Sequence, residues 1–457
     1  MAEIRFIAAA GALGTGIPEG ALREAFQYEP HFIAADAGTT DAGPFSLGSG
    51  LPAFPREAVK HDLDLMLRAA LRLGVPALVG SAGTAGGDVH VDWALDIVRE
   101  IARERGLHLR VAVIYAEQDK SYLKEMLRQG RIRALDPAPH FDEATIEGAV
   151  RMVGMMGAEP LQAALAEGAD LVLAGRCSDA ALYAALPVAR GIPEGLAWHA
   201  GKIVECGTMV CETLGKGVIV GRLTDADATI IPVGAGLRCT PQSVAAHSLY
   251  ENADPYLHRE CSGTLDLSRS VFEAVDERCV RVTGSAFIPA PEYTVKLEGA
   301  TLVGYQSIMV GGIRDPFILK QLDSWLEGVW ETIHKSANAL LGDQMSQNDY
   351  HLMFHVYGRD GVMGALEPKR DVVPHEVGIV VEATAPTQEL ATKLAVLSRQ
   401  PFLHHPIPEW KGAITGFACL HNPAHIERGA VYRFNVHHVV LPRTPDEMFR
   451  RQMVDVS

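Results

Sequence analysis

The chain has 457 residues, of which 48 % are hydrophobic and 21 % charged, and 41 Lys and Arg against 56 Asp and Glu give a formal charge of −15. This apolar fraction supports packed cores and excludes disorder over most of the chain. No cluster of Lys and Arg interrupts the acidic background, so we expect no nucleic-acid binding. No run reaches the ~18 uncharged apolar residues that a membrane span requires, so we expect no membrane insertion.

The seven cysteines are an odd number and do not indicate a disulfide framework. The apolar opening Ile7–Leu13 is similar to the core of a signal peptide, but it is short, Glu3 precedes it and no credible cleavage site follows it. A buried strand running into a glycine loop is the better interpretation. We therefore expect a cytoplasmic protein with reduced cysteines.

Short apolar strands alternate with amphipathic helices over the first half of the chain. Strands are predicted at residues 4–9, 32–36, 76–79, 109–115 and 170–174. Helices are predicted at Ala58–Leu73, Trp93–Arg105 and Pro160–Glu167, where apolar residues recur at helical spacing. This alternation is typical of a parallel sheet covered on both faces, so residues 1–235 are predicted to form an α/β domain.

The pattern changes after residue 235. Short β-branched segments predict strands at Cys279–Thr283, Tyr293–Leu297, Gln306–Val310, Met353–Tyr357, Gly378–Glu382 and Tyr432–Val440. Two helices are predicted, an interrupted one over Asp315–Leu341 and another over Thr387–Gln400. Residues 236–457 are therefore predicted to form a second, β-rich α+β domain, and no linker rich in Ser, Gly or charge precedes it.

Four glycine-rich turns follow predicted strands, at Gly11–Gly16, Gly38–Gly50, Gly80–Asp88 and Gly175–Asp179. Such turns lie at the carboxyl ends of parallel strands, where backbone N–H groups can hold an oxyanion. None matches a nucleotide-binding fingerprint, so no nucleotide cofactor is predicted. Each turn alone is equally well explained as a sharp connection. Four in one domain favour a pocket for a carboxylate or phosphate, with Gly83 and Thr84 as candidate substrate-binding residues.

Charged residues follow two of these strands. Asp41 is a candidate general base or metal ligand, although an Asx turn also explains it. Arg176 follows the most apolar strand and is predicted to grip a substrate carboxylate with two hydrogen bonds, with Ser178 as a further substrate-binding residue. Asp179 is a candidate catalytic residue, with a helix cap as the alternative.

A compact polar cluster follows, with His, Lys, Glu and Cys within eight residues. If this segment is helical, His199, Lys202 and Cys206 share one face, and Glu205 lies close to Lys202. His199, Lys202 and Glu205 are therefore candidate acid–base residues, although a salt-bridged surface turn beside a buried cysteine is equally compatible. Zinc bound by His199, Cys206 and Cys211 is a weak alternative because the spacing is not standard. No metal or other cofactor is predicted.

Other polar groups carry less information. Lys296 and Glu298 lie on one face of a predicted strand and are expected to form a solvated ion pair. The pairs His404–His405 and His437–His438 are adjacent in sequence, so on strands their side chains would point to opposite faces, which does not favour a metal site.

The motifs together resemble the acyclic terpene utilisation (AtuA-type) family. The resembling stretches are Ala35–Pro44, Gly175–Asp179, Ala197–Gly207, Tyr293–Gly299, Val356–Pro368 and Val380–Gln388. The resemblance implies a role in the catabolism of terpenoid or other branched acids. Longer members carry a further small C-terminal domain, so the resemblance also implies that a separate small subunit does that domain's work here.

Two functions from different classes follow. The first is an enzyme that acts on a small carboxylate or its acyl-CoA thioester by lyase, hydratase or isomerase chemistry, since removing a proton next to a carbonyl needs a base and an oxyanion stabiliser. The second is a non-catalytic ligand-binding or scaffold subunit of a two-protein complex, because no motif is diagnostic of a mechanism.

Assembly is the last expectation. The strands Gly378–Glu382 and Tyr432–Val440 are expected to leave at least one sheet edge open, and open edges attract pairing partners. We therefore expect a homo-oligomer, a small partner subunit, or both.

Overall fold

The structure is a computed structural model that describes residues 3–39, 43–213 and 215–457. The chain divides into two compact units, one made of residues 1–301 and 434–457 and the other of residues 302–433. These units differ from the predicted division at residue 235. The reason is that β9 (Ala228–Val233) pairs with β13 (Val280–Thr283), which ties the following segment to the same sheet.

The centre of the first unit is a parallel sheet, as the sequence predicts. Its strands lie in the order β1 (Ile4–Ala8), β2 (Phe32–Gly38), β3 (Ala77–Thr84), β7 (Leu171–Ala174) and β4 (Leu109–Ile114). Every residue of β2, β3 and β7 is buried, which explains why apolar and small residues dominate their sequences. Within the described residues the whole sheet has ten strands, these five included.

Antiparallel strands extend the sheet on both sides. Beyond β1 lie β8 (Val218–Leu223), β9, β13 and β12 (Val271–Ala274), and beyond β4 lies β21 (Arg451–Val456). The sheet is therefore mixed, with the parallel strands at its centre.

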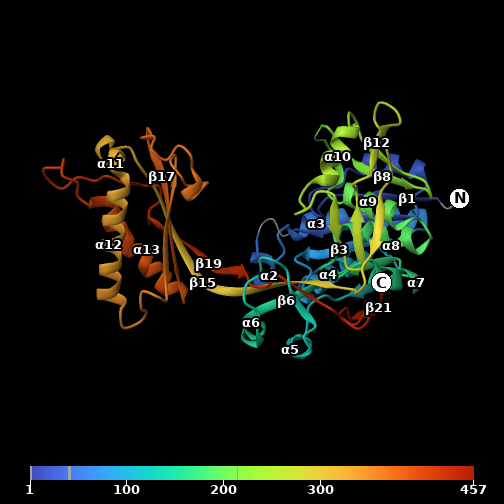
Figure 1. Cartoon of the computed structure of the whole chain (residues 1–457), viewed down its shortest axis with the longest axis horizontal. Coiled ribbons are helices and arrows are strands. Elements are labelled where there is room, and N and C mark those ends of the chain that lie inside the picture. Colours follow the sequence, from blue (N-terminus) through green and yellow to red (C-terminus); the bar gives the residue numbers. More distant parts are fainter. Residues whose placement is uncertain (1–2, 40–42, 214) are drawn as a thin grey trace. The chain divides into compact units, whose positions relative to one another are not determined.

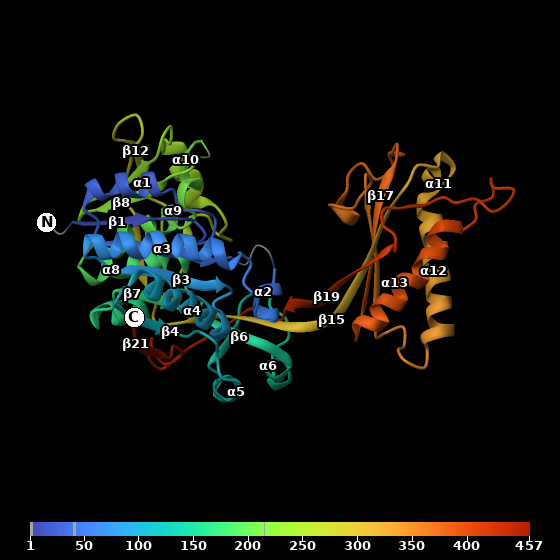
Figure 2. The ribbon, with the colours of Figure 1, turned by 180° about the vertical axis from the view of Figure 1, so that it is seen from behind.

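Helices cover both faces of this sheet. One face packs against α1 (Glu19–Glu24), α3 (Arg56–Leu73) and α4 (Asp88–Arg105), and the other against α7 (Ala158–Ala166), α8 (Asp179–Ala189) and α9 (Glu194–Val204). Figure 1 shows α8 and α9, and Figure 2, from behind, shows α1 and α3. In α3 the buried residues Val59, Leu63, Met66 and Ala70 recur every three or four positions, which places one apolar stripe on the sheet.

The remaining elements of the first unit are shorter. They are η1 (Ala25–Tyr28), α2 (Phe45–Ser49), α5 (Lys120–Arg128), β5 (Ile132–Ala134), α6 (Glu143–Gly148), β6 (Ala149–Met155), η2 (Gly207–Val210), α10 (Pro241–Leu249), β10 (Leu257–Arg259), β11 (Gly263–Asp266), β14 (Ala286–Pro289) and β20 (His438–Val440). The long strand β15 (Val295–Ile313) pairs with β6 and β20 over its first residues.

The second unit is an antiparallel sheet with helices, which confirms the predicted α+β class. Its elements are the rest of β15, α11 (Pro316–Lys320), α12 (Leu322–Leu341), β16 (His351–Tyr357), η3 (Gly364–Leu366), β17 (Val377–Ala385), α13 (Gln388–His404), β18 (Ala418–Cys419) and β19 (His425–Phe434). The predicted interruption in the first long helix falls at Gln321. On α12, Trp325, Val329 and Ile333 are buried at i, i+4 spacing and pack into the core of this unit.

Two strand predictions in this region differ from the structure. Gly378–Glu382 lies within β17, which has β15 on one side and β16 on the other, so it is not an open edge. The predicted strand Tyr432–Val440 is two strands, β19 and β20, separated by residues 435–437. The last strand on the β17 side of this sheet is β16.

Candidate functional site

A cavity of about 740 Å³ lies in the first unit, at the carboxyl ends of the parallel strands. It is lined by the loops after β1, β2 and β7, by the end of α9 and the segment after it, and by residues around β10. This is where open parallel sheets bind ligands. The volume is within the usual range of small-molecule sites, about 300–1,000 Å³.

Two glycines allow these loops to pack together. A Cβ on Gly11 would overlap the backbone of Cys206, and a Cβ on Gly38 would overlap the side chain of Ser81. The glycine-rich turns after β1 and β2 therefore make sharp connections between elements, and they also line the cavity. Ser81 itself has a φ of 48°, in the left-handed region that non-glycine residues rarely adopt.

We expect Gly11→Ala to lower the free energy of unfolding by about 1–3 kcal/mol, because the added methyl group has no room against the Cys206 backbone. Gly20→Ala is the matched control, since nothing lies within 4 Å of a Cβ at this helical position. Denaturant unfolding of both variants checks the prediction, which would be contradicted by equal stabilities.

Arg176, after β7, is buried beside the cavity and holds Glu298 of β15. Its Nε and Nη2 donate to the two carboxylate oxygens of Glu298 at 2.9 and 3.1 Å, and Nη1 donates to the Ser81 hydroxyl at 3.2 Å. Burial raises the pKa of Glu298, but the charge and hydrogen bonds of Arg176 outweigh this effect and leave the pKa below its ordinary value. The bidentate grip predicted for a substrate carboxylate is therefore made with a side chain of the protein itself.

Asp36, at the end of β2, is a carboxyl group with an incomplete set of partners. Its Oδ2 accepts a hydrogen bond from the Gly38 N–H at 2.9 Å, whereas its buried Oδ1 has no hydrogen-bond partner among the described residues. Burial and the nearby charge of Asp179 raise the pKa of Asp36 well above its ordinary value, and Arg176 offsets only part of this.

Glu205 and Glu260 are two further carboxyl groups with raised pKa values. Lys202 donates to Glu205 Oε1 at 2.5 Å, yet burial and Asp179 raise the pKa of Glu205 to about 8. Burial raises the pKa of Glu260 to about 8 as well, and its buried Oε2 has no hydrogen-bond partner in the part of the chain that the structure describes. Burial lowers the pKa of Lys202, but Glu205 outweighs this and raises it overall.

These shifts agree with the charge balance of the site. Asp36, Asp179, Glu205 and Glu260 line the cavity together with the exposed Glu251, and Glu298 contacts the lining residue Arg176, so five carboxyl groups besides Glu251 surround the buried cations Arg176 and Lys202. Two buried cations can balance only two carboxylates, and further ionised groups in a poorly solvated space are costly. The raised pKa values of Asp36, Glu205 and Glu260 agree with this limit, and the values of about 8 for Glu205 and Glu260 favour a bound proton at neutral pH.

The structure brings five of the predicted site residues together. Arg176, Ser178, Asp179, Lys202 and Glu205 all line the cavity. Ser178 is the N-cap residue of α8 and makes no side-chain cap hydrogen bond, and Asp179 is the first residue of that helix, with Oδ1 3.7 Å from Arg176 Nη1. The N-terminus of α8 thus faces the cavity with its partial positive charge.

Other predicted residues lie elsewhere. His199 is buried between the hydroxyls of Ser285 (2.6 Å) and Ser248 (3.0 Å), and burial lowers its pKa to about 3. Gly83 and Thr84 line a smaller hollow, where the Thr84 hydroxyl accepts a hydrogen bond from the Ala53 N–H at 3.0 Å. Asp41 lies outside the described residues.

The zinc alternative gains no support from the geometry. Cys211 Sγ lies 3.8 Å from Cys239 Sγ, whereas both ring nitrogens of His199 face serine hydroxyls. Among the described residues no three His, Cys, Asp or Glu side chains are grouped as metal ligands.

Sequence reasoning missed Asp36, Glu260 and Glu298 as site residues. The expected solvated pair of Lys296 and Glu298 is wrong, because Glu298 is only 8 % exposed and binds Arg176, while Lys296 lies 3.9 Å from it. Asp36 carried a signal, since it ends an apolar strand. Glu260 and Glu298 are distant in sequence from the strand-end loops, so no local pattern points to them.

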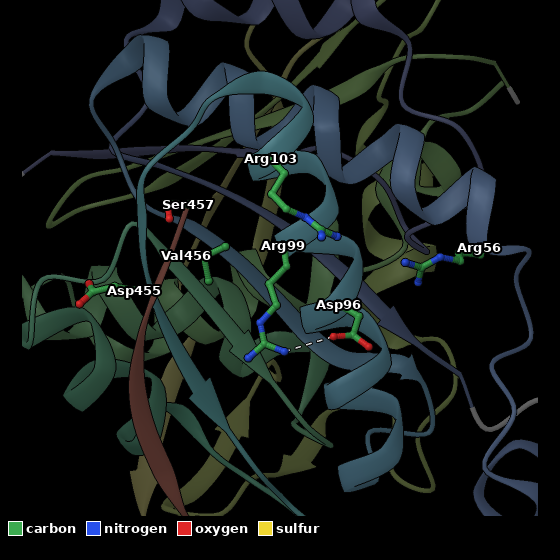
Figure 3. A pocket seen from close by; sticks show the side chains of 7 residues that line it. All are labelled: Arg56, Asp96, Arg99, Arg103, Asp455, Val456 and Ser457. Atoms are coloured by element: carbon green, nitrogen blue, oxygen red, sulfur yellow. Dashed lines mark hydrogen bonds and ion pairs between the residues drawn. The ribbon is translucent and has the colours of Figure 1, made fainter.

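A second hollow, of about 530 Å³, lies along α4 and the end of β21 (Figure 3). Arg99 pairs with Asp96, an interaction that Figure 3 marks with a dashed line, and the two atoms lie 3.1 Å apart. Arg56 pairs with Glu100 at 2.7 Å. These exposed ion pairs contribute little energy, and no buried titratable group lies among the lining residues. The acid–base groups belong to the first cavity.

The fold and this cavity define an α/β protein with a carboxyl-lined cavity at the ends of its parallel strands. Residues 63–408 match the family model described as "Acyclic terpene utilisation family protein AtuA", which is well over half of the chain. The chain therefore belongs to this family, and the family implies involvement in acyclic terpene utilisation. No curated protein and no solved structure matches the chain. No helix of the described residues has the length and apolar character needed to cross a membrane.

Proposed function

We propose that the chain is an enzyme of acyclic-terpene or branched-acid catabolism that acts on a small carboxylic acid or its acyl-CoA thioester by acid–base chemistry, as a lyase, hydratase or isomerase. One observation carries the proposal. Asp36, Glu205 and Glu260 line one cavity, and the pKa of each is raised. Carboxyl groups that keep a proton near neutral pH are the usual general acids of such reactions.

Glu260 is the candidate proton donor and Asp179 the candidate base. For a dehydration, Asp179 takes the proton from the carbon next to the carbonyl, the carbon–oxygen bond to the departing hydroxyl breaks, and Glu260 supplies the proton that turns this hydroxyl into water. The electron pair of the broken carbon–hydrogen bond becomes the new double bond. Hydration is the reverse, and an isomerase returns the proton to another carbon instead.

The N-terminus of α8 is the candidate group that stabilises the negative charge on the substrate during the reaction. Its first N–H groups have no acceptor within the helix, and they face the cavity beside Ser178 and Asp179. A carbonyl oxygen that gains negative charge when the adjacent proton leaves is stabilised by such fixed donors. Arg176 and Glu298 act as positioning residues, because their buried ion pair fixes the loop that carries Asp179.

The test begins with a thermal-shift screen of small hydroxy acids, unsaturated acids and their CoA thioesters. A ligand at 100 times its Kd stabilises the protein by roughly 2.7 kcal/mol. Product analysis of each hit then separates an enzyme from a ligand-binding subunit, because binding without conversion would overturn the enzymatic proposal and support the non-catalytic alternative.

For a converted substrate, we expect Asp179→Asn to lower kcat by about a hundredfold while changing KM little, because the base is lost and the shape is kept. Glu277→Gln removes a charge from an exposed position outside the cavity and serves as the control. Equal kcat values for the two variants would remove Asp179 from the reaction.

A further inference from the structure

The buried part of the cavity has no side-chain cation to spare for a free carboxylate. Arg176 is held by Glu298 at 2.9 and 3.1 Å, and Lys202 is held by Glu205 at 2.5 Å. A substrate carboxylate placed there would compete with the carboxyl groups that already pair with Arg176 and Lys202, and any negative charge beyond the two that these cations can balance is unfavourable in a poorly solvated space. The carbonyl of a thioester is neutral and avoids this cost.

Cations without partners lie elsewhere around the same cavity. Lys216, between η2 and β8, and Arg259, at the end of β10, are exposed lining residues. Neither side chain has a hydrogen bond or an ion pair within residues 3–39, 43–213 and 215–457. In a chain with a net charge of −15, these two cations outnumber the exposed carboxylate Glu251 in the lining and favour an anionic ligand group.

The exposed lining also includes soft apolar surface. Met209 is 59 % exposed and Tyr250 is 45 % exposed, and both line the cavity. The Tyr250 ring stacks on His247, with Lys202 Nζ 5.7 Å from its centroid, and its exposed part together with the Met209 thioether provides contact surface for a planar base. Cations together with such contacts fit a phosphate-bearing nucleotide better than they fit a simple carboxylate.

We infer that the substrate is a coenzyme A thioester, with its phosphates at Lys216 and Arg259, its adenine near Tyr250 and Met209, and its acyl group among Asp36, Asp179 and Glu260. The inference rests on the proposed function and narrows its substrate class from a carboxylic acid or thioester to the thioester. The thin pantetheine arm spans from the exposed lining to the buried carboxyl groups, in a cavity of about 740 Å³.

The test is a calorimetric measurement of coenzyme A binding to the full-length protein, with pantetheine and ADP as partial ligands. We expect coenzyme A to bind at least tenfold more tightly than pantetheine, and ADP to compete with it. The variant Lys216→Ser/Arg259→Ser loses at least tenfold in affinity for coenzyme A and keeps its affinity for pantetheine. Raising the salt concentration weakens coenzyme A binding to the wild type more than to this variant.

The matched control is Arg103→Ser/Lys335→Ser. It also removes one arginine and one lysine side chain, but from exposed positions outside this cavity. It is expected to bind coenzyme A like the wild type. The single variant Lys216→Arg keeps the positive charge and should retain most of the affinity for coenzyme A. It provides a measurement of the role of this charge if the double variant does not fold.

Equal affinities for coenzyme A and pantetheine, or an equal loss in both double variants, would overturn the inference. So would a free acid that binds tightly while coenzyme A does not bind. Because binding is measured without turnover, failure of the acid–base proposal leaves these affinities interpretable. Conversely, conversion of a free acid without coenzyme A binding would overturn the inference and support the proposed chemistry.

Discussion

Glu298→Ala is expected to lower the free energy of unfolding by about 3–5 kcal/mol, because it leaves the guanidinium of Arg176 buried without its bidentate partner. Arg176 is 7 % exposed and Glu298 is 8 % exposed, so water does not replace the lost carboxylate. Asp179, whose Oδ1 lies 3.7 Å from Arg176 Nη1, compensates only in part. Urea unfolding at neutral pH measures the loss.

An exposed pair gives the comparison for this prediction. Lys335 and Glu331 lie 3.4 Å apart on α12, with side chains 78 % and 63 % exposed, so Glu331→Ala should cost no more than about 0.5 kcal/mol. Replacing both buried partners, as Arg176→Met/Glu298→Leu, should recover much of the stability, because neither charge is then left alone. A loss below about 1 kcal/mol for Glu298→Ala would show that water reaches Arg176.

The parallel half of the fold could be predicted from the sequence because its strands are buried on both faces. Phe32–Gly38 and Leu171–Ala174 have no exposed position, so their apolar runs and the amphipathic helices between them are unambiguous. The boundaries of the two units, near residues 301 and 434, could not be found in the same way. Whether β13 joins β9 depends on pairing between segments about fifty residues apart, which leaves no mark in local composition.

The residues of the candidate site could be predicted where a charged or polar side chain directly follows a central strand in the sequence. Arg176, Ser178 and Asp179 directly follow a central strand, and such positions meet at the carboxyl edge of the sheet. His199 shows the limit of helical spacing as evidence. It lies three residues from Lys202 on α9, but its ring is enclosed by Ser248 and Ser285, which only the tertiary structure reveals.

The pH dependence of stability should change in Glu260→Gln. The ordinary pKa of a glutamic acid is 4.5, and burial raises that of Glu260 to about 8 in the folded protein. The folded state therefore holds the proton more tightly than the unfolded chain. The contribution of Glu260 to stability is fully present below pH 4.5 and is lost as the pH rises to about 8.

Glutamine keeps the shape of the protonated acid and does not titrate, so the stability difference between Glu260→Gln and the wild type should grow in favour of the variant over this pH range, by up to about 5 kcal/mol. Urea unfolding at pH 5, 6.5 and 8 measures this difference, and Glu277→Gln, at an exposed position, should show almost none of it. With a converted substrate, the wild-type kcat should fall above pH 8 as the proton donor ionises, whereas Glu260→Gln should have a kcat about 10²–10⁴-fold lower without this ionisation. A stability difference that stays constant from pH 5 to 8 would mean that Glu260 is already ionised in the folded protein, and it could not then act as the acid.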